Sequence, residues 1–252
     1  IAPLLRSLRH QEAPFNNDCP YYTFNDSTQS ATRCVSGCVA TALEQILSYH
    51  KRVYTLADTL KGWSTPHYAI PDVLLGEEVN AALIRNDYSG DYTSEEAAAV
   101  ARLTYWLGMA AKMNWGVGES GASSKRAYEG MKRSFALPYL FYADSYRYSP
   151  QDWEAMLYNE LKAGRPIYYA GNTMRLNGHA FVIDGIDAEG LYHINWGYGG
   201  QFDGYFDLRI LYASEPVYDR QPSGSVQGFL ANHEAIFLHP DAQNVTHPDT
   251  LA

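Results

Sequence analysis

The residues best suited to nucleophilic chemistry in this chain are one cysteine and one histidine, far apart in the sequence. Cys38 opens a segment whose apolar side chains recur every three or four positions, as in an amphipathic helix. A thiol at a helix start faces unpaired N–H groups and the positive end of the helix dipole, which favour the thiolate. His179 precedes a short apolar segment and is the candidate general base. Taken singly, each residue is more often structural than catalytic.

Asn195 is the candidate third member, because an amide can hold an imidazole in one tautomer and orientation. It follows His179 by sixteen residues, and turn-forming residues bracket the midpoint at Asp187. If two strands pair symmetrically about Asp187, His179 and Asn195 lie opposite each other on one face. A two-residue turn would separate them onto opposite faces. We therefore expect a wide loop or a bulge near Asp187.

Neighbouring residues suggest support for the pair, and argue against other chemistry. Trp196 is expected to cover the His–Asn pair and shield it from water, although a core role is compatible with that position. The glycines that follow it precede no helical pattern, so a phosphate-binding loop is not indicated. The histidines are scattered, with no pair four apart on a helix, so no metal site is expected. We expect no cofactor.

Composition excludes several classes of function. The chain has 252 residues, a net charge of −9 and a pI near 5.3, which argues against a nucleic-acid ligand. No apolar run approaches the roughly 18 residues of a membrane span, and residues 1–11 do not form a signal peptide. Three cysteines cannot build a disulfide framework. Whether Cys19 and Cys34 pair stays open.

Periodicity predicts helices early and strands late. The first 37 residues are expected to form an irregular extended arm. Helices are expected from Cys38, at Ser94–Asn114 with Ser94 as N-cap, at Ser124–Phe135, and at Ser149–Gly164. Strands are expected at Pro166–Ala170, Ala180–Ile186, Leu191–Trp196, Tyr205–Leu208 and Ala235–Leu238. This predicts one α+β domain over 1–252, with a helical subdomain at about 1–165, a β subdomain at about 166–252, and the active site in a cleft between them.

Several motifs resemble the streptopain family of papain-clan cysteine peptidases, which includes interpain-like enzymes. The resemblance covers nearly the whole chain. It rests on the opening QEAPFN with Cys19-Pro20, on TRCVSGCVATA around Cys38 with QILSYH, and on GHAFVIDG, YHINWGYGG and DGYFDL. There are two departures: Tyr198 replaces the second Trp of a Trp-Gly-Trp-Gly motif, and His10 stands where Trp is common.

The resemblance implies a papain-like fold and a role for each site residue. Cys38 would be the nucleophile and His179 the base, with Asn195 and Trp196 supporting the histidine and Gln11 as an oxyanion donor. The loop at 116–122 would line the substrate cleft, and the residues expected to bind substrate are Ser120, Gly121, Ala122 and Gly178. The implied activity is that of a secreted bacterial endopeptidase that acts on proteins and prefers an apolar residue just upstream of the residue at the cut. The family carries a signal peptide and an inhibitory pro-segment, so this chain resembles the processed form.

Two other functions remain open on the residues alone. One is a different Cys–His thiol enzyme, an acyltransferase, transglutaminase or amidase, which would transfer the acyl group to an added amine. The other is a non-enzymatic adhesion or glycan-binding module, suggested by 21 tyrosines and an acidic surface. A thiol that is unreactive at neutral pH would favour the second.

Overall fold

The computed structural model describes residues 1–24, 30–173, 177–209, 211, 228–229 and 231–240. The helices are α1 Cys38–Tyr49, α2 Ser94–Ala110, α3 Ser124–Ser134 and α4 Pro150–Lys162, with short 3₁₀ helices η1 Ala81–Leu83 and η2 Ser145–Arg147. The strands are β1 Tyr21–Tyr22, β2 Thr32–Arg33, β3 Val53–Thr55, β4 Trp63–Ser64, β5 Ala69–Ile70, β6 Glu78–Asn80, β7 Tyr139–Asp144, β8 Ile167–Asn172, β9 Gly178–Ile186, β10 Tyr192–Asn195, β11 Gly204–Phe206 and β12 Ala231–His239.

The expected helices form, with the N-cap and the C-terminal end of α2 corrected. Helix α2 begins at Ser94, but its N-cap is Thr93 and not Ser94. The Thr93 hydroxyl accepts from the Glu96 N–H, and the Glu96 carboxylate accepts from the Thr93 N–H, which is a capping box. The helix ends at Ala110, four residues before the predicted Asn114, and Lys112 already has a left-handed φ of 51°. Ser149 caps α4 as predicted.

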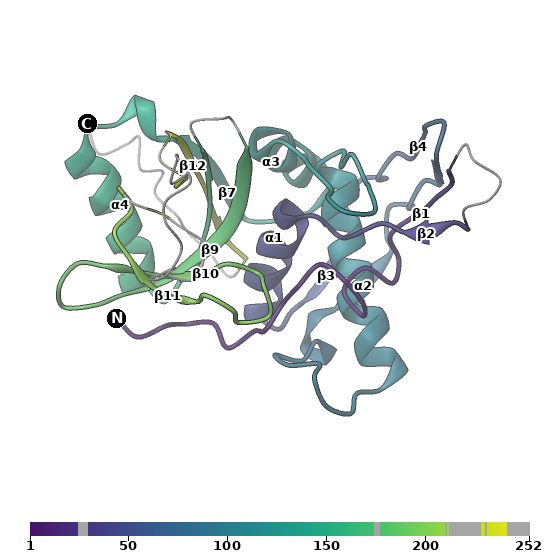
Figure 1. Ribbon diagram of the computed structural model, residues 1–252, viewed down its shortest axis with the longest axis horizontal. Coiled ribbons are helices and arrows are strands. Elements are labelled where there is room, and N and C mark those ends of the chain that lie inside the picture. Colours follow the sequence, from purple (N-terminus) through teal and green to yellow (C-terminus); the bar gives the residue numbers. More distant parts are fainter. Residues whose placement is uncertain (25–29, 174–176, 210, 212–227, 230, 241–252) are drawn as a thin grey trace, which may run out of the picture.

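A six-stranded antiparallel sheet forms the second part of the molecule, with strand order β11-β10-β9-β8-β12-β7 (Figure 1). The five expected strands are all in it. Strand β7 was not expected, and it precedes α4 in the chain. Strand β7 thus joins the sheet from within the part of the chain that was expected to be mainly helical. A mixed helix and sheet architecture is nevertheless what the pattern predicted.

The two faces of the sheet bury different helices. Helix α1 packs against β9 and β8 on one face, together with α3 near β7 and β12 (Figure 1). Tyr168, Ala170, Ala180 and Val182 point to that face and join the larger core. Helix α4 covers the other face, where Trp153 and Leu157 pack against Phe181. Because α1 lies directly on β9, its first turn is held against the start of that strand.

The N-terminal segment is irregular, as expected, except for the short paired strands β1 and β2, and several hydrogen bonds hold it to the rest of the molecule. The Leu4 N–H donates to the Asp184 carbonyl, and the Gly199 N–H donates to the Arg9 carbonyl. Arg9 is itself buried, and its Nε donates to the Glu44 carboxylate of α1 at 2.7 Å. Replacing one partner of such a buried pair destabilises the fold, because the other charge would be left unpaired. The segment thereby carries residues 10 and 11 to the start of α1.

Candidate active site

Cys38 is the first residue of α1, and its thiol lies among backbone N–H groups. The N-cap, Gly37, has no side chain to satisfy the first-turn N–H groups. Burial raises the pKa of the Cys38 thiol, while backbone hydrogen bonds from Ala180 and Val39 lower it. The contact from Ala180 matters most for function, because Ala180 is the residue next to His179. It fixes the thiol against the start of β9.

Gly37 is the residue whose size is most restricted at this helix start. Its φ of 87° lies in a region that L side chains rarely adopt. An added Cβ would lie 2.8 Å from the Met113 side chain and 3.0 Å from the Ser120 carbonyl oxygen. The approach of these groups to the helix start therefore requires glycine.

Gly37→Ala is expected to lower the free energy of unfolding by more than about 2 kcal/mol, from backbone strain and overlap together. Urea unfolding measures it. Gly190→Ala is the matched control, since Gly190 also has a positive φ, 83°, but nothing within 4 Å of an added Cβ. Equal losses in the two variants would show that crowding by Met113 and Ser120 contributes nothing.

His179 stands near the start of β9, and its hydrogen bonds define its tautomer. Its Nε2 lies 3.0 Å from the Trp196 carbonyl oxygen. A carbonyl oxygen only accepts, so Nε2 carries the proton and Nδ1 is the basic nitrogen. The ring is buried, and burial lowers its pKa to about 4, although the Trp196 carbonyl raises it in part. At neutral pH the resting imidazole is uncharged and able to accept a proton.

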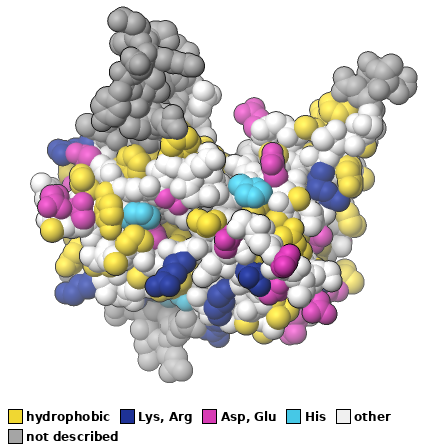
Figure 2. All heavy atoms as spheres, turned by 60° about the horizontal axis from the view of Figure 1, so that its bottom comes forward, with side chains coloured by type: hydrophobic (Ala, Val, Ile, Leu, Met, Phe, Trp, Pro, Cys, Tyr) yellow, Lys and Arg dark blue, Asp and Glu magenta, His cyan; other side chains and the backbone are white. Residues whose placement is uncertain are grey.

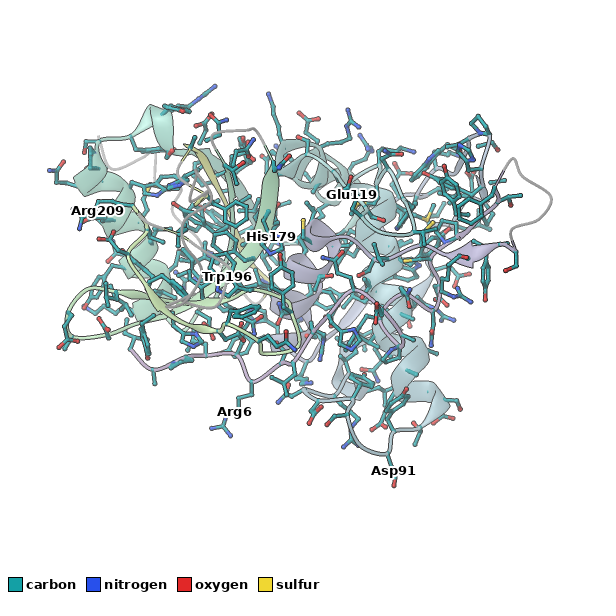
Figure 3. The ribbon with its side chains drawn as sticks, in the orientation of Figure 1. Arg6, Asp91, Glu119, His179, Trp196 and Arg209 are labelled. Atoms are coloured by element: carbon teal, nitrogen blue, oxygen red, sulfur yellow. The ribbon has the colours of Figure 1, made fainter. Side chains whose placement is uncertain are left out.

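Four aromatic rings pack around this imidazole, those of Phe181, Trp196, Tyr198 and Phe229. Tyr198 stacks on it at a centroid distance of 4.9 Å, and its hydroxyl lies 3.5 Å from Nδ1. Trp196 stacks less closely, at 6.1 Å, and is fully buried. Phe229 packs at 5.6 Å. Figure 3 shows His179 and Trp196 side by side next to α1, and the enclosure leaves the ring little freedom to turn.

Asn195 does not meet His179, so the expected register is wrong. In the β9–β10 pair Asn195 is opposite Val182, three residues from His179, which places the two on opposite faces. The Asn195 amide donates to the Ser7 carbonyl at 3.0 Å and accepts from the Gly197 N–H. A bulge does occur in the hairpin, between His193 and Ile194, but it does not bring the pair together. The group that orients the imidazole is the Trp196 carbonyl.

Gln11 reaches the helix start from the N-terminal segment. Its Oε1 accepts a hydrogen bond from the Gly37 N–H at 3.2 Å. Because the amide oxygen is used there, the amide nitrogen is the end that remains as a donor. Gln11 lines the same pocket as Cys38 and His179. Its position fits a second donor beside the Cys38 N–H.

One pocket of about 1390 Å³ contains these groups. The four residues expected to bind substrate also line it, and they are Ser120, Gly121, Ala122 and Gly178. The Ser120 hydroxyl donates to the Val35 carbonyl at 2.7 Å and accepts from the Gly116 N–H. The Ser120 hydroxyl thus stabilises the loop that lines the pocket, and it is already used in hydrogen bonds within the protein. Figure 3 shows Glu119 of the same loop across from His179.

Sequence reasoning missed two contributors to the site. Tyr198 was noted only as a departure from a motif, yet its ring covers the imidazole. Glu234 of β12 also lines the pocket, although it lies fifty-five residues beyond His179. A signal for Tyr198 was present, since it follows Trp196 closely. No signal for Glu234 exists in the local sequence.

Metal and membrane features are absent from the described part of the chain. Its residues hold no group of three or more His, Cys, Asp and Glu side chains suited to a metal ion. They also include no helix of the length and apolarity that a bilayer crossing requires. On the face in Figure 2, basic and acidic side chains are interspersed.

Comparisons with known proteins identify a family whose model matches most of the chain. The model of the peptidase C10 family matches residues 10–206. Streptopain of Streptococcus pyogenes is 34% identical over 189 residues, which cover 70% of this chain and 46% of streptopain. The thiol protease/hemagglutinin PrtT of Porphyromonas gingivalis is 30% identical over 225 residues, covering 84% of this chain and 25% of PrtT. The chain therefore spans less than half the length of these relatives.

Solved structures show the same architecture. Active wild-type interpain A cysteine protease of Prevotella intermedia superposes with a TM-score of 0.79 at 29% identity, covering 94% of this chain and 93% of that one. A prointerpain A fragment superposes with a TM-score of 0.75 at 28% identity, covering 94% and 71%. The mixed helix and antiparallel-sheet fold is therefore that of interpain A.

Proposed function

Because this chain belongs to the peptidase C10 family, we propose that it is a cysteine endopeptidase that hydrolyses peptide bonds in proteins, with Cys38 as nucleophile. The observation that carries the proposal is the tautomer of His179. Its Nε2–H is held by the Trp196 carbonyl, so its basic Nδ1 is available in the pocket that also contains the Cys38 thiol. The site lies in the cleft between the helical part and the sheet.

Acylation begins with a proton transfer from the Cys38 thiol to His179 Nδ1. Burial disfavours either charge alone, but this transfer leaves the net charge of the pocket unchanged and creates two opposite charges that attract each other. The N–H groups of Ala180 and Val39 stabilise the thiolate. Sulfur then attacks the scissile carbonyl carbon and forms a tetrahedral oxyanion.

The oxyanion is held by the Cys38 backbone N–H and the Gln11 amide nitrogen. The imidazolium of His179 gives its proton to the leaving amine, the C–N bond breaks, and a thioester on Cys38 remains. Water then attacks the thioester with His179 Nδ1 as base, which releases the acid product and the thiol. Every step uses this chain's own groups.

Gln11→Ala is expected to lower kcat about 100-fold, as loss of one oxyanion donor does in other acyl-transfer enzymes. Steady-state cleavage of a fluorogenic peptide measures it. Gln11→Glu is the matched variant: it keeps the acceptor for the Gly37 N–H but replaces the donor nitrogen with an oxygen, and it should lose as much activity. A loss of less than threefold in both variants would make Gln11 a structural residue only.

The proposed substrate is an extended polypeptide with an apolar side chain at P2, the position just upstream of the residue whose carbonyl is attacked. Three alanines, Ala122, Ala170 and Ala180, line the pocket near the thiol and support this preference. Small residues leave room, and their methyl groups give an apolar surface.

We further infer secretion from a bacterial cell, and synthesis with an inhibitory pro-segment that is removed before activity. Bacterial relatives and the existence of a prointerpain A structure support this. In this proposal the pro-segment occupies the cleft before any protein substrate binds there.

Incubation with casein under reducing conditions tests the proposal. We expect casein to be degraded, and a thiol-alkylating epoxide to stop the reaction by forming one adduct on Cys38, found by peptide mass spectrometry. Undiminished cleavage by a fully alkylated sample would contradict it. Transfer of the acyl group to an added amine in preference to water would indicate an acyltransferase, and a thiol inert to the epoxide would indicate a binding module.

A further inference from the structure

One row of residues crosses the sheet beneath the pocket. Ala180 of β9 is opposite Ala170 of β8, Ala170 is opposite Glu234 of β12, and Glu234 is opposite Asp144 of β7. Directly opposite residues in antiparallel strands point to the same face. All four line the pocket. With about 5 Å between opposite Cα atoms, the Glu234 backbone lies about 10 Å from that of Ala180.

The row begins at the nucleophile. The Ala180 N–H contacts the Cys38 thiol, and Tyr168 lies two residues before Ala170 on β8 and lines the same pocket. Tyr168 is fully buried, and its hydroxyl is paired with Ser124 at 2.9 Å. The lining between the thiol and the glutamate thus includes the two methyl groups of Ala170 and Ala180 and the Tyr168 side chain, whose hydroxyl is already paired.

Glu234 is held in position at the end of the row. Its Oε1 accepts a hydrogen bond from the Tyr142 hydroxyl of the neighbouring strand. Within the described residues, Glu234 Oε2 has no hydrogen-bond partner. The next residue in the row, Asp144, caps η2 through the Tyr146 N–H. Glu234 therefore keeps a fixed carboxylate with one oxygen available.

Among the described residues that line the pocket, the only basic side chains are two histidines. Its described lining includes the carboxylates of Glu234, Asp144 and Glu119, and no Lys or Arg. These histidines are His67 and His179, and burial lowers the pKa of His179 to about 4. A partly buried carboxylate without a cation gains most from a substrate that supplies one.

We propose that Glu234 makes the P2 subsite selective for Lys and Arg side chains in addition to apolar ones. This rests on the proposed peptidase function and deepens it. Lys and Arg have an apolar stem and a charged tip. The stem lies over Ala180 and Ala170, and the tip donates to Glu234 Oε2. An apolar P2 side chain uses only the first half of the same path.

Two fluorogenic peptides that differ only at P2, leucine against arginine, test this. We expect the wild-type protein to cleave both. Glu234→Gln keeps the size of the side chain and an acceptor for Tyr142 but removes the charge. It should lower the arginine-to-leucine ratio of kcat/KM about ten- to hundredfold, the usual effect of losing a charge-assisted hydrogen bond.

Glu119→Gln is the matched control, because it removes a carboxylate from the same pocket on the facing loop, and it should leave the ratio within about twofold. A general folding defect lowers both rates and leaves the ratio unchanged, so the ratio isolates the subsite. An unchanged ratio in Glu234→Gln, or a wild-type protein that cleaves only the leucine peptide, overturns the inference alone. Failure of the wild-type protein to cleave either peptide overturns the proposed function and this inference together.

Discussion

Cys38→Ala is expected to lower kcat/KM for peptide hydrolysis at least about 10⁴-fold, since removal of the nucleophile of a triad-type enzyme leaves only binding and the oxyanion donors. Cys38→Ser should lose nearly as much, because a hydroxyl is a far weaker nucleophile in a site built for a thiol. Hydrolysis of a fluorogenic peptide measures the loss. The free energy of unfolding should change little, because Cys38 is only partly buried and alanine keeps its Cβ.

Cys34→Ala is the control for this prediction. Cys34 is fully buried and lies four residues away, and burial raises the pKa of its thiol to about 11. It has no base beside it, so its loss should affect stability and leave kcat/KM within a few-fold. If peptidase activity survives in Cys38→Ala, or is lost only in Cys34→Ala, then Cys38 is not the nucleophile.

His179→Ala is expected to lower kcat/KM about 10³-fold, within the 10²- to 10⁴-fold range of a general acid and base. The wild-type protein should also show a characteristic pH profile. His179 accepts a proton only while it is neutral, and its pKa is lowered from 6.5 to about 4. Activity should therefore persist as the pH falls below 6.5 and disappear around pH 4.

A pH series of kcat/KM with the fluorogenic peptide measures this acid limb. His67→Ala is the matched control, because His67 lines the same pocket but stacks on Tyr22 away from the thiol. It should alter the rate by no more than a few-fold and leave the limb in place. An acid limb near pH 6.5 would mean that the imidazole is solvated during turnover. Near-normal turnover in His179→Ala would exclude it as the base.

Local sequence was sufficient for the elements that position the catalytic pair. The start of α1 at Cys38 follows from the apolar periodicity after it, and α4 from Ser149 and Pro150 at its first positions. Strands β8 to β12 follow from short aromatic and β-branched segments bounded by glycine and aspartate. These signals are local, so no knowledge of tertiary packing was needed to predict them.

The predicted register of the β9–β10 hairpin is wrong, and the physical reason is the environment of Asp184. Aspartate is a turn-forming residue by type, yet Asp184 is fully buried within β9. Its carboxylate accepts from His193 Nδ1 at 2.6 Å and from the Leu5 N–H at 2.8 Å. The turn lies later, where Asp187 accepts from the N–H groups of Glu189 and Leu191. Hydrogen-bond partners that are distant in sequence thus determine where the turn forms. A local sequence pattern does not contain this information.

Local sequence did not reveal strand β7 or the place of Glu234 in the pocket, for a related reason. Tyr139–Asp144 becomes a strand because it pairs with β12, about ninety residues later in the chain. Glu234 enters the pocket only because that pairing and the β12–β8 pairing align it with Ala170. Sheet position is a property of several strands together, so a single segment does not contain it.

The site draws on widely separated parts of the chain: position 11, the first turn of α1, the start of β9, the loop after β10, and β12. Contacts of such long sequence separation slow folding, because loop closure must precede them. During synthesis the helix that bears Cys38 emerges well before the strand that bears His179. A partly made chain therefore holds a thiol without its base. The proposed catalytic pair is complete only when the sheet closes on α1, so the topology alone keeps the thiol and its base apart in a nascent chain.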